Sequence, residues 1–175
     1  PHIANCLYTG LSTDTGCFQY ANTNAATLRA AARLLELGAD NRKISMDFFR
    51  KISRARMALV GQIYSGMRFF RGGQVAIAVV TRALIDALQA TEDDCDDIAG
   101  LPGRADGVVV SVTIRELLDG RSKISVRSNP EVDACAICAV YGGGGHKMAS
   151  GCTLDCGTET AVEKILAAID QVWPA

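Results

Sequence analysis

The 175-residue sequence lacks three features that would each assign the protein to a particular class. It contains no apolar run long enough to span a bilayer, and its start has no basic segment followed by an apolar one. We therefore expect neither a membrane-spanning nor a secreted protein. The net charge is only −1, which argues against a protein that coats long duplex nucleic acid. A compact globular protein of the cytoplasm is the resulting expectation.

The seven cysteines are an odd number, and without a secretory signal they favour free thiols over a disulfide framework. Cys135 and Cys138, with Cys152 and Cys156, have the spacing of two metal-binding knuckles. However, Cys135 and Cys138 lie one helical turn apart in an apolar run, where small buried thiols are common. We therefore predict core thiols and not a structural zinc site.

The charge is distributed unevenly along the chain. Residues 1–71 carry ten basic and four acidic side chains, whereas residues 72–175 carry eight basic and fifteen acidic ones. Such an asymmetry predicts two structural units. The sequence also changes character at Arg71-Gly72-Gly73, where β-branched strands begin.

Before this boundary the pattern is mainly helical. Residues 14–16 indicate a turn after a short helix or strand, and Thr23 or Asn24 can cap a helix that ends at Gly38. A second helical region is predicted over residues 45–70. Its basic side chains form either a solvated face or one wall of a phosphate-binding cleft.

After the boundary, strands alternate with helices. Strands are predicted at residues 74–81, 108–116, 122–128 and 150–154. Helices are predicted at residues 82–90, 131–141 and 159–173, with an acidic loop at 91–107. The pattern is typical of an α/β or α+β domain in which helices flank a mixed β-sheet.

The run Gly142 to Gly145, followed by His146, is the strongest local signal for function. Consecutive glycines allow several backbone N–H groups to converge on an anion, and the histidine can donate to a phosphate oxygen. No Gly-Lys-Ser/Thr ending follows, and no strand immediately precedes the glycines, so P-loop and dinucleotide-binding folds are disfavoured. The alternative is a flexible loop with a chance histidine.

Three further residues are candidates for the site. Strand alternation places Ser125 and Arg127 on one face, and an arginine at a strand end can bind a phosphate with two hydrogen bonds. Ser128 follows directly. Considered alone, Arg127 is a surface residue and Asp14 is a turn residue, because one carboxylate does not bind a hard metal ion tightly.

Together, "LYTGLSTDTGCFQYAN", "SKISVRSNPEVDA" and "YGGGGHKMASG" resemble consecutive landmarks of the DHH phosphoesterase superfamily. The best fit is the bacterial nanoRNase/pAp-phosphatase subfamily, whose C-terminal half is a DHH-associated substrate-binding domain. The resemblance implies that Asp14 helps to hold two manganese ions. It also implies that Arg127 and Ser128 contact substrate phosphate, and that Gly143, Gly144, Gly145 and His146 bind the nucleotide end. The reaction would be hydrolysis assisted by two metal ions.

The sequence departs from this family because the Asp-His-His motif and the other upstream metal-binding motifs are absent. The acidic run at residues 93–97 lies in a loop and is no replacement. We therefore expect residues 1–40 to be the tail of a truncated catalytic domain, residues 41–71 a basic helical connector and residues 72–175 the substrate-binding domain. The start at Pro1 is compatible with a fragment. Such a chain would bind nucleotide phosphate without tight manganese binding or turnover.

The expected parent is a manganese-dependent phosphodiesterase or phosphatase that hydrolyses short single-stranded oligoribonucleotides or pAp. A non-catalytic nucleic-acid-binding module is the alternative from another functional class. RecJ-type exonucleases, exopolyphosphatases and cyclic-dinucleotide phosphodiesterases remain open within the superfamily. The accessory domain of alanyl-tRNA synthetases is less compatible with the His-Lys pair that follows the glycines. The sequence leaves a homodimer open.

Overall fold

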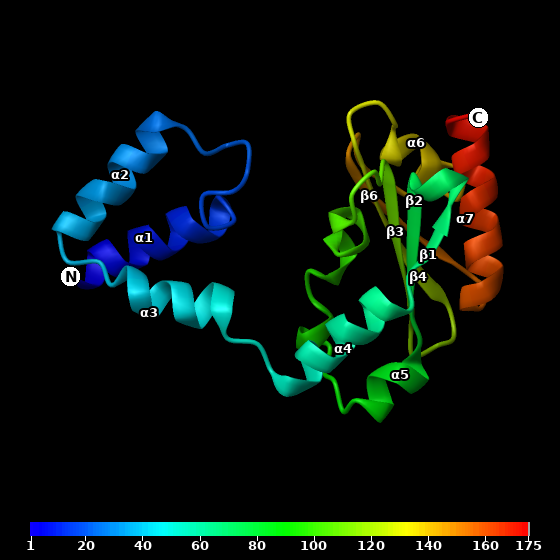
Figure 1. Cartoon of the computed structure of the whole chain (residues 1–175), viewed down its shortest axis with the longest axis horizontal. Coiled ribbons are helices and arrows are strands. Elements are labelled where there is room, and N and C mark those ends of the chain that lie inside the picture. The colour runs from blue at the N-terminus through cyan, green and yellow to red at the C-terminus, as the bar shows by residue number, and fades with distance from the viewer. Residues whose placement is uncertain (175) are drawn as a thin grey trace. The chain divides into compact units, whose positions relative to one another are not determined.

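The computed structural model describes residues 1–174 of the chain. The chain forms two compact units, Pro1–Ile52 and Ser53–Ala175, each of which has its own internal packing (Figure 1). The predicted connector at residues 41–71 is divided between these units, and the predicted boundaries at 40/41 and 71/72 stay a prediction. Among residues 1–174, no helix has both the length and the apolar character needed to cross a membrane.

The first unit consists of helices α1 (His2–Asp14), α2 (Ala25–Glu36) and α3 (Asn41–Ser45), which continues as a π-helical turn η1 (Met46–Arg50). Asn24 caps α2, because its side chain accepts hydrogen bonds from the amides of Ala26 and Thr27. The core of this unit is small and centres on Tyr8, Ala31 and Ile44.

The prediction of one helical region over residues 45–70 was wrong in two places. The helix is interrupted at residues 51–53, where Ser53 starts the new helix α4 (Arg54–Ser65) by accepting a hydrogen bond from the amide of Arg56. After Gly66 the chain becomes the short strand β1 (Arg68–Phe70), which pairs with β2 (Val75–Val80). The aromatic pair at Phe69 and Phe70 thus lies in a strand and not at a helix end.

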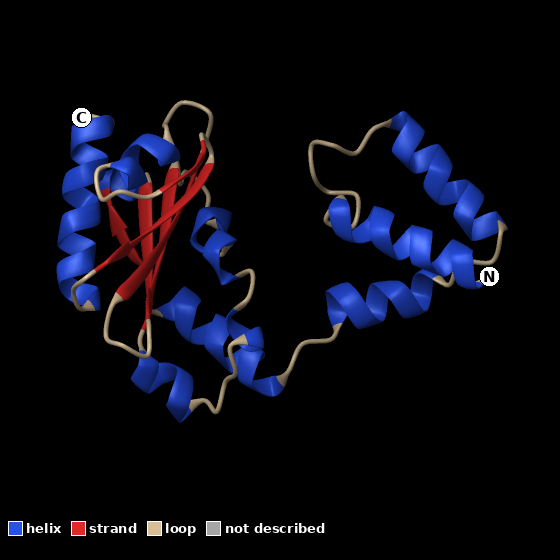
Figure 2. Ribbon diagram, turned by 180° about the vertical axis from the view of Figure 1, so that it is seen from behind, coloured by secondary structure: helices blue, strands red, loops and turns tan. Residues whose placement is uncertain are grey.

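The second unit is built on a six-stranded sheet with the order β1-β2-β3-β4-β6-β5 (Figure 2). Its other strands are β3 (Val110–Glu116), β4 (Ser122–Ser128), β5 (Gly144–His146) and β6 (Ala149–Leu154). The β2–β3 pair is parallel and the other pairs are antiparallel. The sequence predicts four of these strands, whereas β1 and β5 are too short and glycine- or arginine-rich to be recognised.

Helices cover both faces of the sheet to different extents. On one face, α6 (Ala134–Ala139) and α7 (Thr158–Val172) enclose the main core with the inward residues of β2, β3, β4 and β6. On the other face, α4, α5 (Arg82–Ala87) and the buried side chains of residues 95–101 cover Ala78 and Val80 of β2. The prediction of a mixed sheet flanked by helices is confirmed.

The acidic segment after α5 is ordered by its own contacts. It contains three 3-10 turns, η3 (Asp93–Cys95), η4 (Ile98–Gly100) and η5 (Pro102–Arg104), while η2 (Arg71–Gly73) precedes β2. Cys95, Ile98 and Leu101 of this segment are buried. The aspartate side chains of this segment are exposed or half-buried around this short apolar anchor.

Candidate functional site

The glycine run joins helix α6 to the edge strand β5. The amides of Gly142 and Gly143 donate to the carbonyl oxygens of Ala139 and Cys138, both at 3.0 Å. Gly144–His146 then pairs with β6. The expected nest of consecutive converging amides is therefore wrong, because the helix end takes the first two donors and the remaining residues form a strand.

The physical reason for having glycine differs between the positions of this run. At Gly143, an added Cβ would overlap the carbonyl oxygen of Gly151 and lie 2.5 Å from Cβ of Cys152. At Gly145, it would lie 2.5 Å from the carbonyl oxygen of Ala149. At Gly144, by contrast, a Cβ would meet nothing within 4 Å, and the residue is exposed. Internal packing thus explains Gly143 and Gly145 but gives no reason for glycine at position 144.

Arg127, Ala149 and His146 lie in register across the neighbouring strands β4, β6 and β5. Residues directly opposite each other in antiparallel strands point to the same face, so all three side chains do so here. With strands about 4.8 Å apart, the α-carbons of Arg127 and His146 are about 10 Å apart. The small side chain of Ala149 leaves the space between them open.

This row lies on the face opposite α6 and α7. Val126 and Cys152, which alternate with the row along their strands, are buried in the main core. The alternation predicted for β4 is therefore what the structure shows. The next row on the open face consists of Ser125, Gly151 and Gly144. A serine and two glycines form a shallow floor beside Arg127 and His146.

A cavity of about 220 Å³ adjoins this floor, with β3 and β4 on one side and residues 95–99 on the other. Arg127 lines it and also lines a second cavity of about 200 Å³ with Arg104 and Asn129. The Arg127 guanidinium donates to the carbonyl oxygen of Val126 at 3.0 Å. In the part of the chain that the structure describes, Arg127 forms no ion pair. Its charge is thus available to an anionic ligand.

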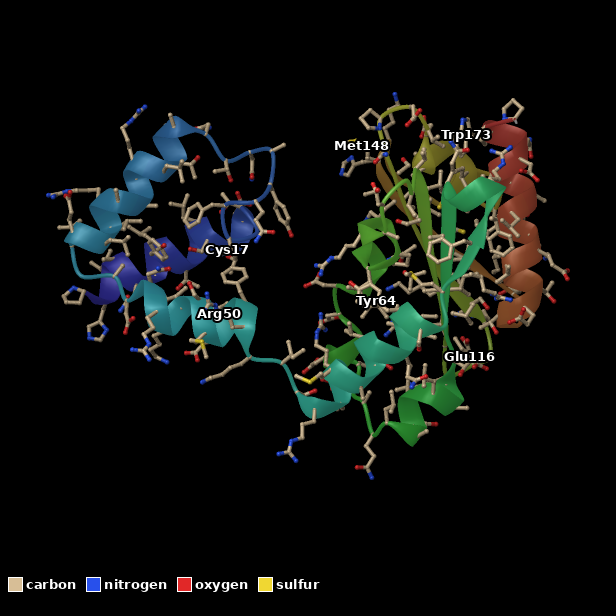
Figure 3. All side chains as sticks on the ribbon, in the orientation of Figure 1. Cys17, Arg50, Tyr64, Glu116, Met148 and Trp173 are labelled. Carbon is tan, nitrogen blue, oxygen red and sulfur yellow. The ribbon has the colours of Figure 1, made fainter. Side chains whose placement is uncertain are left out.

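Ser128 lies on the other side of the strand from Arg127. Its hydroxyl donates to the carbonyl oxygen of Val132 at 2.8 Å, and its amide donates to the carbonyl oxygen of Met148 at 3.1 Å. The hydroxyl bond joins the end of β4 to the segment before α6, and the amide bond joins it to the β5–β6 turn. Met148 of this turn lies at the end of the sheet opposite Glu116 (Figure 3). The predicted phosphate contact of Ser128 stays a prediction, and the structure gives this residue a positioning role.

Asp14 belongs to the first unit, where it is the last residue of α1. Its carboxylate accepts a hydrogen bond from Asn22 Nδ2 at 3.1 Å. Over residues 1–174, no three histidine, cysteine or acidic side chains form a group that could hold a metal ion. A single carboxylate does not fit a two-manganese centre, which needs several oxygen or nitrogen ligands.

Of the four cysteines with knuckle-like spacing, for which core thiols were predicted, Cys138 and Cys152 lie next to Gly143. Cys138 and Cys152 are buried in the main core, and Cys135 and Cys156 are half-buried. Contact with the Cys152 thiol lowers the pKa of Cys138 to about 7, and the same contact raises the pKa of Cys152. Burial raises the pKa of the nearby Tyr141, whose hydroxyl donates to the carbonyl oxygen of Lys164 at 2.8 Å.

Two residues of the open face were missed by the sequence analysis. Lys123 has the same strand parity as Ser125 and Arg127, so alternation alone could have identified it. Gly151 forms part of the floor through its pairing with Ser125 and Gly144, and no signal in the sequence predicts this register.

Three kinds of comparison relate this chain to known proteins. The family model described as "DHHA1 domain" matches residues 72–173. A bifunctional oligoribonuclease and PAP phosphatase NrnA from Thermus thermophilus is 39% identical over 95% of this chain and 50% of its own length. The protein of the same name from Mycoplasma genitalium is 34% identical over 86% of this chain and 46% of its own length.

An A-adding tRNA nucleotidyltransferase from Geobacter sulfurreducens is 28% identical over 98% of this chain but 19% of its own length. The crystal structure of an exopolyphosphatase-related protein from Bacteroides fragilis superposes with a TM-score of 0.87 at 28% identity, covering 96% of this chain and 49% of that one. The chain therefore spans about half the length of the NrnA relatives and of this structure.

Proposed function

This chain belongs to the DHHA1 domain family, as the resemblance in its sequence predicted, and we propose that it binds the phosphate end of a short single-stranded oligoribonucleotide or of pAp. The family match and the relatives named as bifunctional oligoribonuclease and PAP phosphatase support this substrate class. The hydrolase activity is proposed for a longer protein that includes such a chain.

The row Arg127–Ala149–His146 is the observation that carries the proposal. A guanidinium can bind two phosphate oxygens at once, and an imidazole can donate a third hydrogen bond from the other side of Ala149. The exposed Gly144 lets a sugar or phosphate approach the backbone of β5 closely. The site therefore binds and orients an anionic end group.

Catalysis by this chain alone is not part of the proposal. Two bound manganese ions would supply an activated water and stabilise the displacement at phosphorus in the parent enzyme. Asp14 is the residue of this chain assigned to them by resemblance, but among residues 1–174 it belongs to no group of three or more histidine, cysteine or acidic side chains that could hold a metal ion. The Arg127 row is proposed to hold the substrate while other residues of the parent carry out hydrolysis.

Calorimetric titration of the 175-residue chain with a 5′-phosphorylated trinucleotide of RNA tests the binding site. We expect Arg127→Gln and His146→Ala each to weaken binding by about 1–3 kcal/mol, because each removes a charge-assisted or polar contact. Lys164→Gln is the matched control, since Lys164 is exposed on α7 at the opposite face. Equal affinities for all four proteins would remove this row from the binding site.

A hydrolysis assay with manganese and a short RNA tests the absence of turnover. We expect no product from the chain, because one carboxylate cannot hold two metal ions. Robust hydrolysis that is lost in Asp14→Ala would contradict this expectation and place a working centre in the first unit.

A non-catalytic RNA-binding module is a second candidate, favoured by the match to tRNA nucleotidyltransferases over nearly the whole chain. Such a module would bind a folded tRNA more tightly than a trinucleotide. The same titration with tRNA distinguishes the two candidates.

A further inference from the structure

A third polar row lies on the open face, two residues further along each strand. Lys123 of β4 is in register with Arg115 of β3 and Thr153 of β6, so these three side chains share the face of Arg127 and His146. Lys123 precedes Arg127 by four positions on one strand, which places their α-carbons about 13 Å apart. The face therefore carries two basic positions with a shallow floor between them.

The two basic side chains of this third row differ in whether their charge is paired with a carboxylate. Arg115 is 18% exposed and binds Glu92 at 2.6 Å, so its charge is neutralised within the fold. Together with Arg82, it holds the pKa of the Glu92 carboxyl below its usual range. Lys123 is exposed and forms no ion pair within residues 1–174. Lys123 is thus the available charge of the row.

The cavity of about 220 Å³ connects the two basic positions, because Lys123, Ser125 and Arg127 all line it. Its volume is below the range of about 300–1,000 Å³ that is usual for whole small-molecule ligands. This volume suits one nucleotide of an RNA that enters and leaves the cavity. An extended RNA can follow β4 through the cavity from Arg127 to Lys123.

From this arrangement we propose that Lys123 binds a second phosphate of the same oligonucleotide, separate from the phosphate held by Arg127 and His146, with about 13 Å between the α-carbons of Lys123 and Arg127. This inference rests on the proposed function and defines its substrate more closely. The spacing exceeds the rise of about 3.4 Å per nucleotide in a stacked strand, so a ligand needs several nucleotides or an extended backbone to reach both positions. A mononucleotide reaches one position only.

The opposite wall of the cavity determines the orientation of the bound oligonucleotide. Asp96 and Asp97 line this wall, and carboxylates only accept hydrogen bonds. They repel phosphate groups and accept bonds from ribose hydroxyls or base amino groups. The oligonucleotide therefore lies with its phosphates toward β4 and its hydrogen-bond donors toward residues 96–97.

The experiment titrates the 175-residue chain with 5′-phosphorylated oligoribonucleotides of one to five residues at several salt concentrations. For Lys123→Gln we expect unchanged binding of the mononucleotide and about five- to tenfold weaker binding of the longer ligands. The slope of log K against log salt should also fall by about 0.7 for the longer ligands, as for one lost phosphate contact on a single strand. Lys164→Gln should match the wild type at every length.

Two outcomes would overturn the second phosphate position while leaving the proposed function intact. One is a Lys123→Gln protein with wild-type affinity at every length, while Arg127→Gln is impaired. The other is an equal loss for the mononucleotide and the longer ligands, which would show a general electrostatic effect. Wild-type affinities in Arg127→Gln and His146→Ala for all ligands would instead refute the proposed function.

Discussion

The glycines of residues 142–145 differ in the space that surrounds a side chain at each position. Gly143 packs so closely on β6 that a methyl group would meet Cβ of Cys152 at 2.5 Å, whereas Gly144 has open space around it. Gly143 therefore serves the fold, and Gly144 is free to serve a ligand. Alanine substitution at each position therefore adds one methyl group, at a tightly packed site in one variant and at an open site in the other.

We predict that Gly143→Ala lowers the free energy of unfolding by about 1–3 kcal/mol, as expected for overpacking in a tight site. Gly144→Ala should leave stability within about 0.5 kcal/mol of wild type and weaken nucleotide binding. Urea denaturation and calorimetry of both variants measure these effects. A Gly144→Ala protein with normal stability and normal affinity would show that no ligand approaches this part of β5.

The elements around the site are short and depend on their caps and ion pairs. Helix α6 has six residues, and Asp133 caps it by accepting a hydrogen bond from the amide of Ala136 at 3.0 Å. The carbonyl oxygens of Ala139 and Cys138 at its other end bind the first two glycine amides. The stability of α6 is thus linked directly to the conformation of the glycine run.

We predict that Asp133→Ala lowers the free energy of unfolding by about 1 kcal/mol, the usual loss for a removed N-cap. Asp133→Asn should retain most of it, because asparagine is an equally good cap. Urea denaturation measures the loss, and faster hydrogen exchange at Gly142 and Gly143 would report loosening of the helix end. Unchanged stability in Asp133→Ala would contradict the capping role.

The acidic segment is held to the sheet by Glu92, which contacts Arg82 at 3.0 Å and Arg115 at 2.6 Å. Arg115 and then Arg82 lower the pKa of Glu92 below its ordinary value of 4.5. A carboxyl group with a lowered folded-state pKa stabilises the fold above the unfolded pKa, and this contribution disappears as the pH falls through the folded value.

We therefore predict that Glu92→Gln reduces stability at pH 7 by at most about 1 kcal/mol, because the Glu92 side chain is largely exposed to solvent. As the pH falls below 4.5, its stability should fall less steeply than that of wild type. Thermal unfolding across this range measures the difference, with Glu163→Gln on α7 as an exposed control. Parallel curves for wild type and Glu92→Gln would contradict the ion-pair contribution.

On the scale of the whole molecule, the two units differ in how much core they can bury. Unit 1 has 52 residues and one small core cluster, whereas unit 2 has two larger clusters around its sheet. Small domains bury a lower fraction of their surface and are correspondingly less stable. The proposed binding residues all lie in unit 2.

We predict that limited proteolysis cuts first within residues 1–53 and leaves a resistant fragment close to residues 53–175. This fragment should unfold cooperatively and bind the trinucleotide as tightly as the whole chain. Mass spectrometry and calorimetry identify the fragment and its affinity. Loss of binding in a folded fragment would show that unit 1 contributes to the site.

Sequence alone determined the local features of this protein. Strand alternation placed Ser125 and Arg127 on one face, Thr23 or Asn24 was predicted as a cap and Asn24 is the one observed, and three sequence motifs together identified the family. The site residues themselves stay predictions. Each local feature depends on residues within a few positions of each other, so period and residue type were sufficient.

Tertiary structure decided which distant residues share a row. The pairing of Arg127 with Ala149 and of His146 with Ala149 is set by strand register, as is the position of Lys123 beside Arg115. A shift of one residue would turn each strand's side chains to the other face, and no local pattern fixes this choice. The buried core of α6, α7 and the sheet fixes it, because the apolar faces of all strands must meet there.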